Sequence, residues 1–155
     1  MKHKNILFVC SGNQCRSPMA EALFENLASK DGEFRSAEIE IGSAGTMPYI
    51  DGTPATVEAI EVMREHGIDI GPHRARHIDQ VLFDRADLIL VMASKHKAYI
   101  HDRFGNDGGK VHLFTEFVGQ EGDIEDPAGF GIAAYRECAR DLQRLTSLLK
   151  YKLGC

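Results

Sequence analysis

The segment Lys4-Asn5-Ile6-Leu7-Phe8-Val9-Cys10-Ser11-Gly12-Asn13-Gln14-Cys15-Arg16-Ser17-Pro18 decides the fold of this chain. Its apolar part, residues 4–10, is typical of a strand that is buried on both faces. Ser17 and Pro18 then open a helical pattern of apolar residues, and Pro is favoured at the first position of a helix. The segment therefore predicts a strand, a short loop and a helix in direct succession.

The rest of the chain continues this alternation of short apolar runs and helical patterns. Such patterns predict strands at residues 37–42, 87–92 and 110–114, and helices at residues 54–66, 94–104 and about 131–149. Thr53 is the expected cap and Gly67 the expected stop of the helix at residues 54–66, and residues 43–46 are expected to end the preceding strand. Because strands that alternate with helices favour right-handed crossovers, we expect a doubly wound, three-layer α/β fold with a four-stranded parallel sheet. In such folds ligands bind beyond the carboxyl ends of the strands.

Length and composition limit the class of protein. The 155 residues suit a single domain, expected to span residues 1–155, with 43% apolar and 26% charged residues. No apolar run approaches the roughly 20 residues of a membrane span, and the first residues lack a signal-peptide pattern, so we expect a cytoplasmic protein without a membrane partner. A net charge of -5 argues against a general nucleic-acid binder. The cysteines at positions 10, 15, 138 and 155 form no disulfide framework, and we interpret them as thiols.

The loop between the first strand and the first helix is the expected reactive site. It lies where backbone N–H groups and a helix N-terminus converge on an anion, so phosphate or another oxyanion is the expected ligand. The same donors, together with Arg16, would stabilise a thiolate on Cys10 and make it a nucleophile at neutral pH. The guanidinium of Arg16 matches two phosphate oxygens and can stabilise charge on the equatorial oxygens during transfer. A lone cysteine at a strand end is more often a small buried hydrophobe, but here the spacing to Arg16 and the strand-to-helix location favour a nucleophile.

The remaining loop residues are suited to hold the shape of the loop. Gly12 permits a tight turn, Asn13 can adopt a left-handed conformation, and Ser17 can donate to the Cys10 sulfur. The expected phosphate-binding positions are Ser11, Gly12, Asn13, Gln14, Cys15 and Ser17.

The segment Val9-Cys10-Ser11-Gly12-Asn13-Gln14-Cys15-Arg16-Ser17-Pro18-Met19-Ala20-Glu21 resembles the signature of the low molecular weight protein tyrosine phosphatase family. Residues 43–46, residues 87–92 and Asp126-Pro127 resemble, in the same order, the segment after the second strand, the third strand and the late acid-bearing loop of that family. The resemblance implies a flavodoxin-like fold and hydrolysis of phosphotyrosine in phosphorylated proteins through a phosphocysteine, without metal or cofactor. It implies Cys10 as nucleophile, Arg16 as phosphate ligand and Asp126 as general acid.

The identity of the acid depends on this resemblance. A carboxyl on a loop over the site can protonate the leaving atom and later activate water as a base. Asp123 and Glu125 lie in the same loop as Asp126, and the residues alone do not choose strongly among the three. Pro127 favours Asp126, because proline stiffens the backbone of the residue before it.

Two residues near the loop, Ser43 and Cys15, each have two possible interpretations. Ser43 supports the phosphate loop in the resembling family, but a serine in such a turn can simply satisfy its own backbone. Cys15 in this family is placed to form a reversible disulfide with Cys10, and the alternative is a packed structural thiol.

Other candidate residues are weaker. His73 and His77 have the spacing of two ligands on a helix, but a third ligand is not evident, so we expect no metal site and prefer exposure to solvent or local hydrogen bonding. Tyr49 and Phe130 either border the substrate entrance or pack on their own loops.

The chain departs from the tyrosine-specific pattern at two positions. Ala128 follows Asp126-Pro127 where many members carry an aromatic residue. Gln14 matches neither the threonine of arginine-specific members nor the branched apolar residue of tyrosine-specific ones. A protein arginine phosphatase of the same family is therefore the alternative to a tyrosine phosphatase.

Two further functions are disfavoured. A thiol-dependent arsenate reductase needs additional relay cysteines, which are missing between Met92 and His101. A non-catalytic oxyanion-binding module would not need the set of Cys10, Arg16 and Asp126. We expect the enzyme to be a monomer or a weak dimer.

Overall fold

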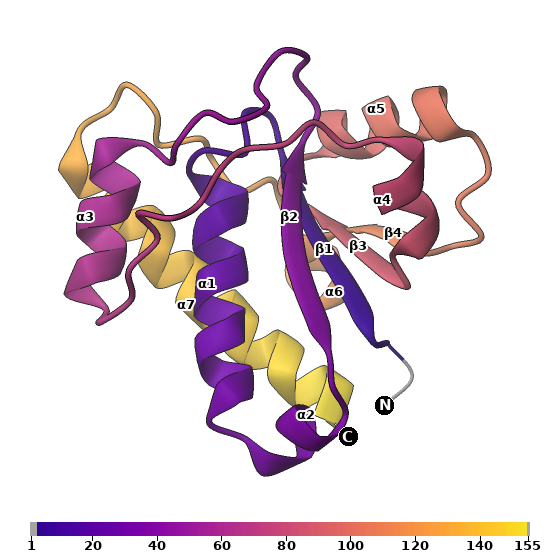
Figure 1. The fold of residues 1–155 in the computed structure, drawn as a ribbon, viewed down its shortest axis with the longest axis horizontal. Coiled ribbons are helices and arrows are strands. Elements are labelled where there is room, and N and C mark those ends of the chain that lie inside the picture. Colours follow the sequence, from indigo (N-terminus) through magenta and orange to yellow (C-terminus); the bar gives the residue numbers. More distant parts are fainter. Residues whose placement is uncertain (1–2, 155) are drawn as a thin grey trace.

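The computed structural model describes residues 3–154 and, within them, a four-stranded parallel sheet of order β2-β1-β3-β4 (Figure 1). The strands are β1 (Asn5–Cys10), β2 (Glu40–Gly45), β3 (Leu88–Val91) and β4 (Val111–Leu113). β1 pairs with β2 on one side and with β3 on the other, so the chain leaves β1 between two neighbours at the carboxyl edge of the sheet. The expected flavodoxin-like α/β fold is confirmed, because a strand order beginning 2-1-3-4 is that of this doubly wound class.

Helices cover both faces of the sheet. They are α1 (Arg16–Ser29), α2 (Gly32–Ser36), α3 (Val57–Glu65), α4 (Gln80–Arg85), α5 (Ser94–Phe104), α6 (Phe114–Phe117) and α7 (Ile132–Gly154). Helices α1, α3 and α7 lie on one side of the sheet and α4 and α5 on the other, which makes three layers (Figure 1).

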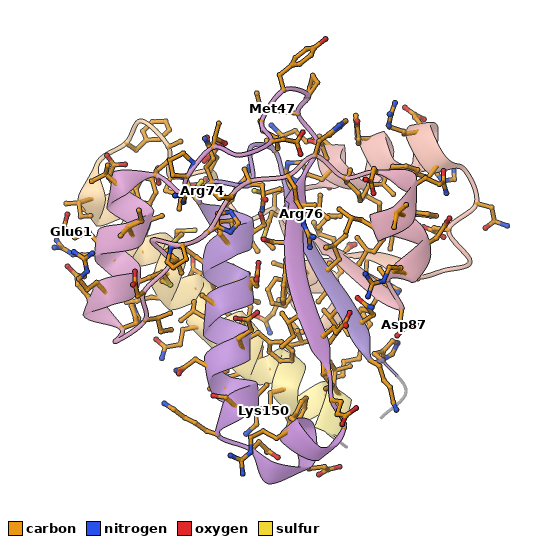
Figure 2. The ribbon with its side chains drawn as sticks, viewed as in Figure 1. Met47, Glu61, Arg74, Arg76, Asp87 and Lys150 are labelled. Atoms are coloured by element: carbon orange, nitrogen blue, oxygen red, sulfur yellow. The ribbon has the colours of Figure 1, made fainter. Side chains whose placement is uncertain are left out.

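The side chains of the central strands alternate between two cores. Ile6, Phe8 and Cys10 of β1 belong to the core shared with α1 and α7, while Leu7 and Val9 belong to the core beneath α4 and α5. A strand buried on both faces is therefore confirmed for the segment before the reactive loop. Asp87 lies near the opposite end of β1 (Figure 2). Its carboxylate accepts hydrogen bonds from the N–H groups of Lys4 and Asn5, at 3.1 and 2.9 Å.

The second strand lies later in the sequence than expected. Residues 37–42 were the prediction, but β2 spans Glu40–Gly45, and Glu38 in the preceding turn has a positive φ of 54°. Residues 43–45 looked like a strand end because they are small, yet Ser43 and Gly45 pair in register with Phe8 and Cys10. Long-range pairing with β1, rather than local propensity, decides this boundary.

Helix ends also differ from the predictions. Helix α3 begins at Val57, not at residue 54, and its N-cap is Thr56 rather than Thr53, since the Thr56 hydroxyl accepts from the N–H of Ala59. Pro54 instead forms an isolated antiparallel bridge with Arg74, which keeps that segment extended. Helix α7 continues past the expected residue 149, and the short helices α2, α4 and α6 were not predicted. Helix α5 has the expected bounds.

Candidate active site

The loop between β1 and α1 surrounds the Cys10 thiol. Cys10 is the last residue of β1 and its side chain is almost fully buried. Its Sγ atom lies 2.9 Å from the hydroxyl oxygen of Ser17, in the first turn of α1. The N-cap of α1 is Cys15, whose side chain makes no capping bond, so backbone N–H groups at this helix end are not capped by that residue. The Ser17 hydroxyl and these backbone N–H groups are therefore hydrogen-bond donors near the buried Cys10 sulfur.

Asn13 fixes the shape of the loop. Its φ of 53° is left-handed, a conformation that asparagine tolerates better than most residues. Its buried amide Nδ2 donates to the hydroxyl oxygens of Ser17 and Ser43, at 2.8 and 2.9 Å, and its Oδ1 accepts from the N–H of Arg76 at 3.0 Å. A further contact, of 2.8 Å, joins the Asn13 carbonyl oxygen to Nε2 of His73. The loop is therefore held from three other segments of the chain.

Ser43 continues this network away from the loop. Its hydroxyl accepts from Asn13 and donates to Oε1 of Glu21 on α1 at 2.5 Å. The backbone oxygen of Ser43 accepts from Nε of Arg76 at 2.9 Å, and Arg76 lies beside β2 (Figure 2). Of the two interpretations of Ser43, the structure places its hydroxyl in contact with the loop.

Gly45 permits the close approach of the loop to β2. A Cβ atom at this position would lie 2.6 Å from the carbonyl oxygen of Ser11 and 2.6 Å from Cδ1 of Ile50. Two backbone bonds close the same junction, because the N–H groups of Thr46 and Met47 donate to the carbonyl oxygens of Cys10 and Ser11. Glycine is required here by space, and its φ is not positive.

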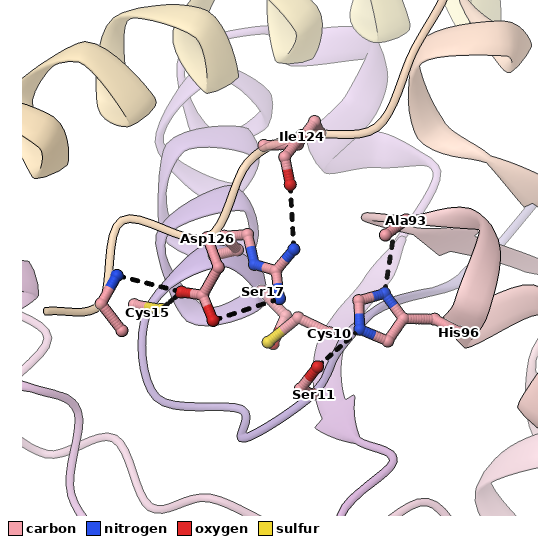
Figure 3. Close-up of polar contacts among 10 residues, drawn as sticks. Cys10, Ser11, Cys15, Ser17, Ala93, His96, Ile124 and Asp126 are labelled. Atoms are coloured by element: carbon pink, nitrogen blue, oxygen red, sulfur yellow. Dashed lines mark hydrogen bonds and ion pairs between the residues drawn. The ribbon is translucent and has the colours of Figure 1, made fainter. Parts of the chain in front are cut away.

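Arg16 connects the loop with the segment that carries the candidate acid. Its side chain is 3% exposed, and Nη1 donates to the carbonyl oxygen of Ile124 at 2.9 Å (Figure 3). Nη2 lies 3.7 Å from Oδ2 of Asp126. Among the described residues, the Nε atom of Arg16 is the buried side-chain nitrogen or oxygen without a hydrogen-bond partner. A buried guanidinium with an unpaired N–H fits an anion that would accept from it.

The segment around Asp126 is anchored at both its backbone and its side chains. The N–H of Ile124 donates to the carbonyl oxygen of Met92, the residue after β3, at 2.8 Å. Asp123 accepts from the backbone and hydroxyl of Ser94 at the start of α5, at 2.9 and 3.0 Å. The Asp126 side chain is 47% exposed and its Oδ1 accepts from the N–H of Ala128 at 3.1 Å.

The three acidic candidates thus have different surroundings. Asp123 is engaged with α5, and Glu125 is exposed. Asp126 is the candidate that forms an ion pair with Arg16. Position alone therefore favours Asp126 as the carboxyl nearest the loop.

Cys15 faces Asp126 rather than solvent. Its Sγ–H donates to Oδ1 of Asp126 across 3.5 Å. Burial, followed by the neighbouring Cys10 and Asp126, raises the pKa of the Cys15 thiol. Burial also raises the pKa of Cys138, on α7, to about 12. Cys10, Cys15 and Cys138 are free thiols in the structure, and Cys155 lies outside the described residues.

His96 on α5 contacts the loop, which the sequence did not indicate. Its Nε2 lies 2.8 Å from the Ser11 hydroxyl oxygen, and its Nδ1 accepts from the N–H of Ala93 at 3.0 Å (Figure 3). His96 is 1% exposed. The contact arises because β3, which leads into α5, pairs with β1. No local spacing signals it, since 85 residues separate the two side chains.

The histidine pair of the sequence analysis is not a helical pair. Residues 71–79 contain no helix, and His77 instead contacts the hydroxyl of Tyr99 on α5 at 2.7 Å. His73 contacts the carbonyl oxygen of Asn13, as described above. Within residues 3–154, no group of three or more His, Cys, Asp or Glu side chains could hold a metal ion.

A cavity of about 860 Å³ lies between the Asp126 segment and α7. Arg16, Asp126 and Phe130 are among its lining residues, and Phe130 is 78% exposed. Tyr49 is 97% exposed, on the segment whose Met47 donates to the loop. Phe130 thus borders the hollow beside the candidate acid, and Tyr49 does not pack on its own loop.

The chain matches a known protein family over nearly its whole length. Residues 5–154 match the family model described as low molecular weight phosphotyrosine protein phosphatase. The protein-arginine-phosphatase of Bacillus subtilis (strain 168) is 37% identical over 150 residues, which cover 96% of each chain. The probable low molecular weight protein-tyrosine-phosphatase EpsP of Ralstonia solanacearum is 39% identical over 141 residues, which cover 91% of this chain and 90% of that protein.

The solved structures include a similar molecule. The low molecular weight protein tyrosine phosphatase from T. tengcongensis has a TM-score of 0.87 and 40% identity, and the match covers 96% of this chain and 98% of that chain.

No helix within residues 3–154 has the length and apolar character needed to cross a membrane.

Proposed function

Because this chain belongs to the low molecular weight phosphotyrosine protein phosphatase family, we propose that it hydrolyses phosphotyrosine in proteins through a phosphocysteine on Cys10. Members of this family are cysteine-dependent hydrolases. The residues proposed to act are Cys10, Arg16 and Asp126, with the loop from Ser11 to Ser17 holding the phosphate.

The buried Arg16 guanidinium is the observation that supports this proposal most strongly. It belongs to the loop that starts at Cys10, it reaches Asp126 at 3.7 Å, and its Nε lacks a partner among the described residues. Nε and Nη2 together could donate to two oxygens of a phosphoryl group, while Nη1 stays on Ile124. A structural arginine would be expected to use all its buried donors within the protein.

The first half of the proposed reaction transfers the phosphoryl group to sulfur. The Cys10 thiolate attacks phosphorus, a P–S bond forms, and the bond from phosphorus to the tyrosyl oxygen breaks. Asp126 gives its proton to the leaving oxygen, so that neutral tyrosine departs. Ser17, 2.9 Å from Sγ, can donate to the thiolate before attack and after its return.

The second half regenerates the enzyme. Asp126, now a carboxylate, accepts a proton from water as the water oxygen attacks phosphorus. The P–S bond breaks and inorganic phosphate leaves with Cys10 again a thiolate. Arg16 and the loop N–H groups stabilise the equatorial oxygens in both transfers.

Phosphoarginine is the second candidate substrate. The loop carries the polar residues Ser11 and Gln14, and Ala128 supplies no aromatic side chain next to Asp126-Pro127. These positions suit a polar guanidinium as well as a phenyl ring, and the Bacillus subtilis relative is named a protein-arginine-phosphatase. In that reaction the bond that breaks joins phosphorus to nitrogen, and Asp126 protonates the nitrogen.

We also propose a cytoplasmic location and phosphorylated proteins as partners. The proposed nucleophile supports this location, because the Cys10 thiolate must stay reduced in order to attack phosphorus.

The test compares phosphate release from matched phosphotyrosine and phosphoarginine peptides, in EDTA and at neutral pH. We expect turnover of phosphotyrosine that Cys10→Ser abolishes, and a phosphoenzyme that can be trapped by rapid quenching of the wild type. Higher kcat/KM for phosphoarginine would assign the second substrate. Turnover that persists in Cys10→Ser would contradict the mechanism for both.

A further inference from the structure

His96 is held in one tautomer by its surroundings. The N–H of Ala93 donates to Nδ1 at 3.0 Å, so Nδ1 carries no hydrogen. A neutral imidazole then carries its hydrogen on Nε2, and the 2.8 Å contact with Ser11 is a hydrogen bond from Nε2–H to the Ser11 hydroxyl oxygen (Figure 3). Both ring nitrogens are therefore occupied.

The neutral state of His96 follows from its position. Burial, followed by the positive charges of Arg16 and Lys95, lowers the pKa of His96 to about 4. Asp123 and Asp126 act in the opposite direction with smaller effect. At neutral pH His96 is thus a fixed donor to Ser11, not an acid or a base.

This donor sets the role of the Ser11 hydroxyl. A hydroxyl that accepts from His96 on one lone pair must direct its own hydrogen elsewhere. Ser11 directly follows Cys10, its side chain is only partly buried, and its carbonyl oxygen is held by the N–H of Met47 at 3.0 Å. The backbone and side chain of Ser11 are thus both fixed, and the hydroxyl hydrogen faces away from His96.

We propose that His96 is a positioning residue that acts through Ser11, orienting the Ser11 hydroxyl as an additional hydrogen-bond donor to the oxyanion held by the loop. The inference rests on the proposed function, because it assigns one more donor to the same phosphate site. The His96 side chain thereby connects α5 to the site, in addition to Cys10, Arg16 and Asp126.

The test combines five variants with two measurements. The variants are His96→Ala, His96→Gln, Ser11→Ala and the double variant that combines His96→Ala with Ser11→Ala. The fifth, His101→Ala, is a control at an exposed histidine of the same helix. The measurements are the dissociation constant of inorganic phosphate, followed by amide NMR, and kcat and KM on a phosphotyrosine peptide. Gln is included because its side-chain amide can replace Nε2–H as a donor to Ser11.

We expect His96→Ala and Ser11→Ala each to weaken phosphate binding about two- to tenfold, the effect of one hydrogen bond, and to lower kcat/KM by a similar factor. His96→Ala should have no further effect in the Ser11→Ala background. His96→Gln should recover most of the loss, and His101→Ala should bind phosphate like the wild type. The NMR signals of His96 should show the Nε2-protonated tautomer from pH 8 down to about pH 5.

Three outcomes would overturn the inference while the wild type remains active and Cys10-dependent. One is unchanged phosphate binding in Ser11→Ala, which also decides the matter if His96→Ala does not fold. Another is an equal effect of His96→Ala with and without the Ser11 hydroxyl. The third is loss of stability in His96→Ala with unaltered phosphate binding and kinetics. A wild type without Cys10-dependent activity would instead contradict the proposed function.

Discussion

Arg16 donates from Nη1 to the backbone carbonyl oxygen of Ile124, 2.9 Å away and 108 residues later in the chain. The bond holds the segment before Asp126 against the phosphate loop. Ile124 is held from its other side, since its N–H donates to the carbonyl oxygen of Met92. The candidate acid is therefore carried by a segment with fixed backbone on one side.

Replacing the candidate acid should slow catalysis without unfolding the protein. We expect Asp126→Asn to lower kcat by about 10²- to 10⁴-fold on a phosphotyrosine peptide, because the leaving oxygen loses its proton donor. The loss should be smaller for aryl phosphates whose leaving phenol is acidic, which can be measured across a leaving-group series. Asp126 is 47% exposed, so its replacement should change the free energy of unfolding little.

Glu125→Gln and Asp123→Asn are the matched controls for this prediction. Glu125 is exposed, and its replacement should leave kcat near the wild-type value. Asp123→Asn should cost stability by roughly 1 kcal/mol, because Asp123 accepts from the first residue of α5. A loss in Glu125→Gln as large as that in Asp126→Asn would assign the acid to Glu125.

Adding one methyl group at Gly45 should disturb the loop. In Gly45→Ala the new Cβ would lie 2.6 Å from the Ser11 carbonyl oxygen, so the loop backbone must shift. We expect a destabilisation of about 1–3 kcal/mol and a lower kcat/KM. Urea unfolding and steady-state kinetics measure the two effects. In Gly32→Ala, by contrast, the Cβ meets nothing within 4 Å, and the helix position should gain up to about 1 kcal/mol. Equal effects of the two substitutions would show that the loop does not need the space.

Asn13 combines a backbone and a side-chain requirement that two variants can separate. Asn13→Ala removes three side-chain hydrogen bonds and leaves alanine at a φ of 53°. We expect a loss of about 3–5 kcal/mol in the free energy of unfolding. Asn13→Gly removes the same bonds but accepts the left-handed conformation, so it should be less damaging by about 1 kcal/mol. Identical unfolding free energies would mean that the backbone conformation carries no cost.

The buried His96 should make stability depend on pH. Its pKa is about 4 in the folded protein and about 6.5 in an unfolded chain, so the unfolded state binds the proton first. The free energy of unfolding should therefore fall as the pH drops from about 6.5 to about 4. Protonation of His96 accounts for up to about 3 kcal/mol of this fall. Above pH 6.5 the contribution of His96 is fully present.

The measurement is the difference between the wild type and His96→Gln across this pH range. The difference is needed because Glu25 also makes the free energy of unfolding depend on pH. Partial desolvation and the neighbouring Glu21 raise the pKa of Glu25 to about 7. The folded protein takes up that proton first, so Glu25 lends stability at low pH that is lost as the pH rises toward 7. A constant difference between wild type and His96→Gln would show that His96 is protonated alike in both states.

The local parts of the fold and the site could be predicted from the sequence. The strand, loop and helix of residues 5–29 follow from neighbouring residues, and the same stretch brings Cys10, Arg16 and Ser17 together. Helix α5 has its predicted bounds because the two apolar strands at residues 87–92 and 110–114 leave one segment between them for a crossover helix.

Features set by distant contacts could not be predicted in this way. The end of β2 depends on pairing between Gly45 and Cys10, and small residues in a turn-like run hide that pairing. The placement of Asp126 near Arg16 depends on bonds to Met92 and Ile124, so the sequence suggested it only through a family resemblance. The contact between His96 and Ser11 depends on the order of strands in the sheet, for which no residue pattern gives a sign.

β1 is a central strand of the sheet, and this has a consequence for the synthesis of the chain. β1 is made first, but its partner β3 ends at Val91, and the Ile124 carbonyl that holds Arg16 is made later still. Since such domains fold as units, a nascent chain on the ribosome carries Cys10 long before it has the surroundings of Cys10. During that interval the thiol is an ordinary one, because the residues that surround Cys10 in the folded protein are not yet in place. Phosphatase activity should begin only when nearly the whole chain has left the ribosome.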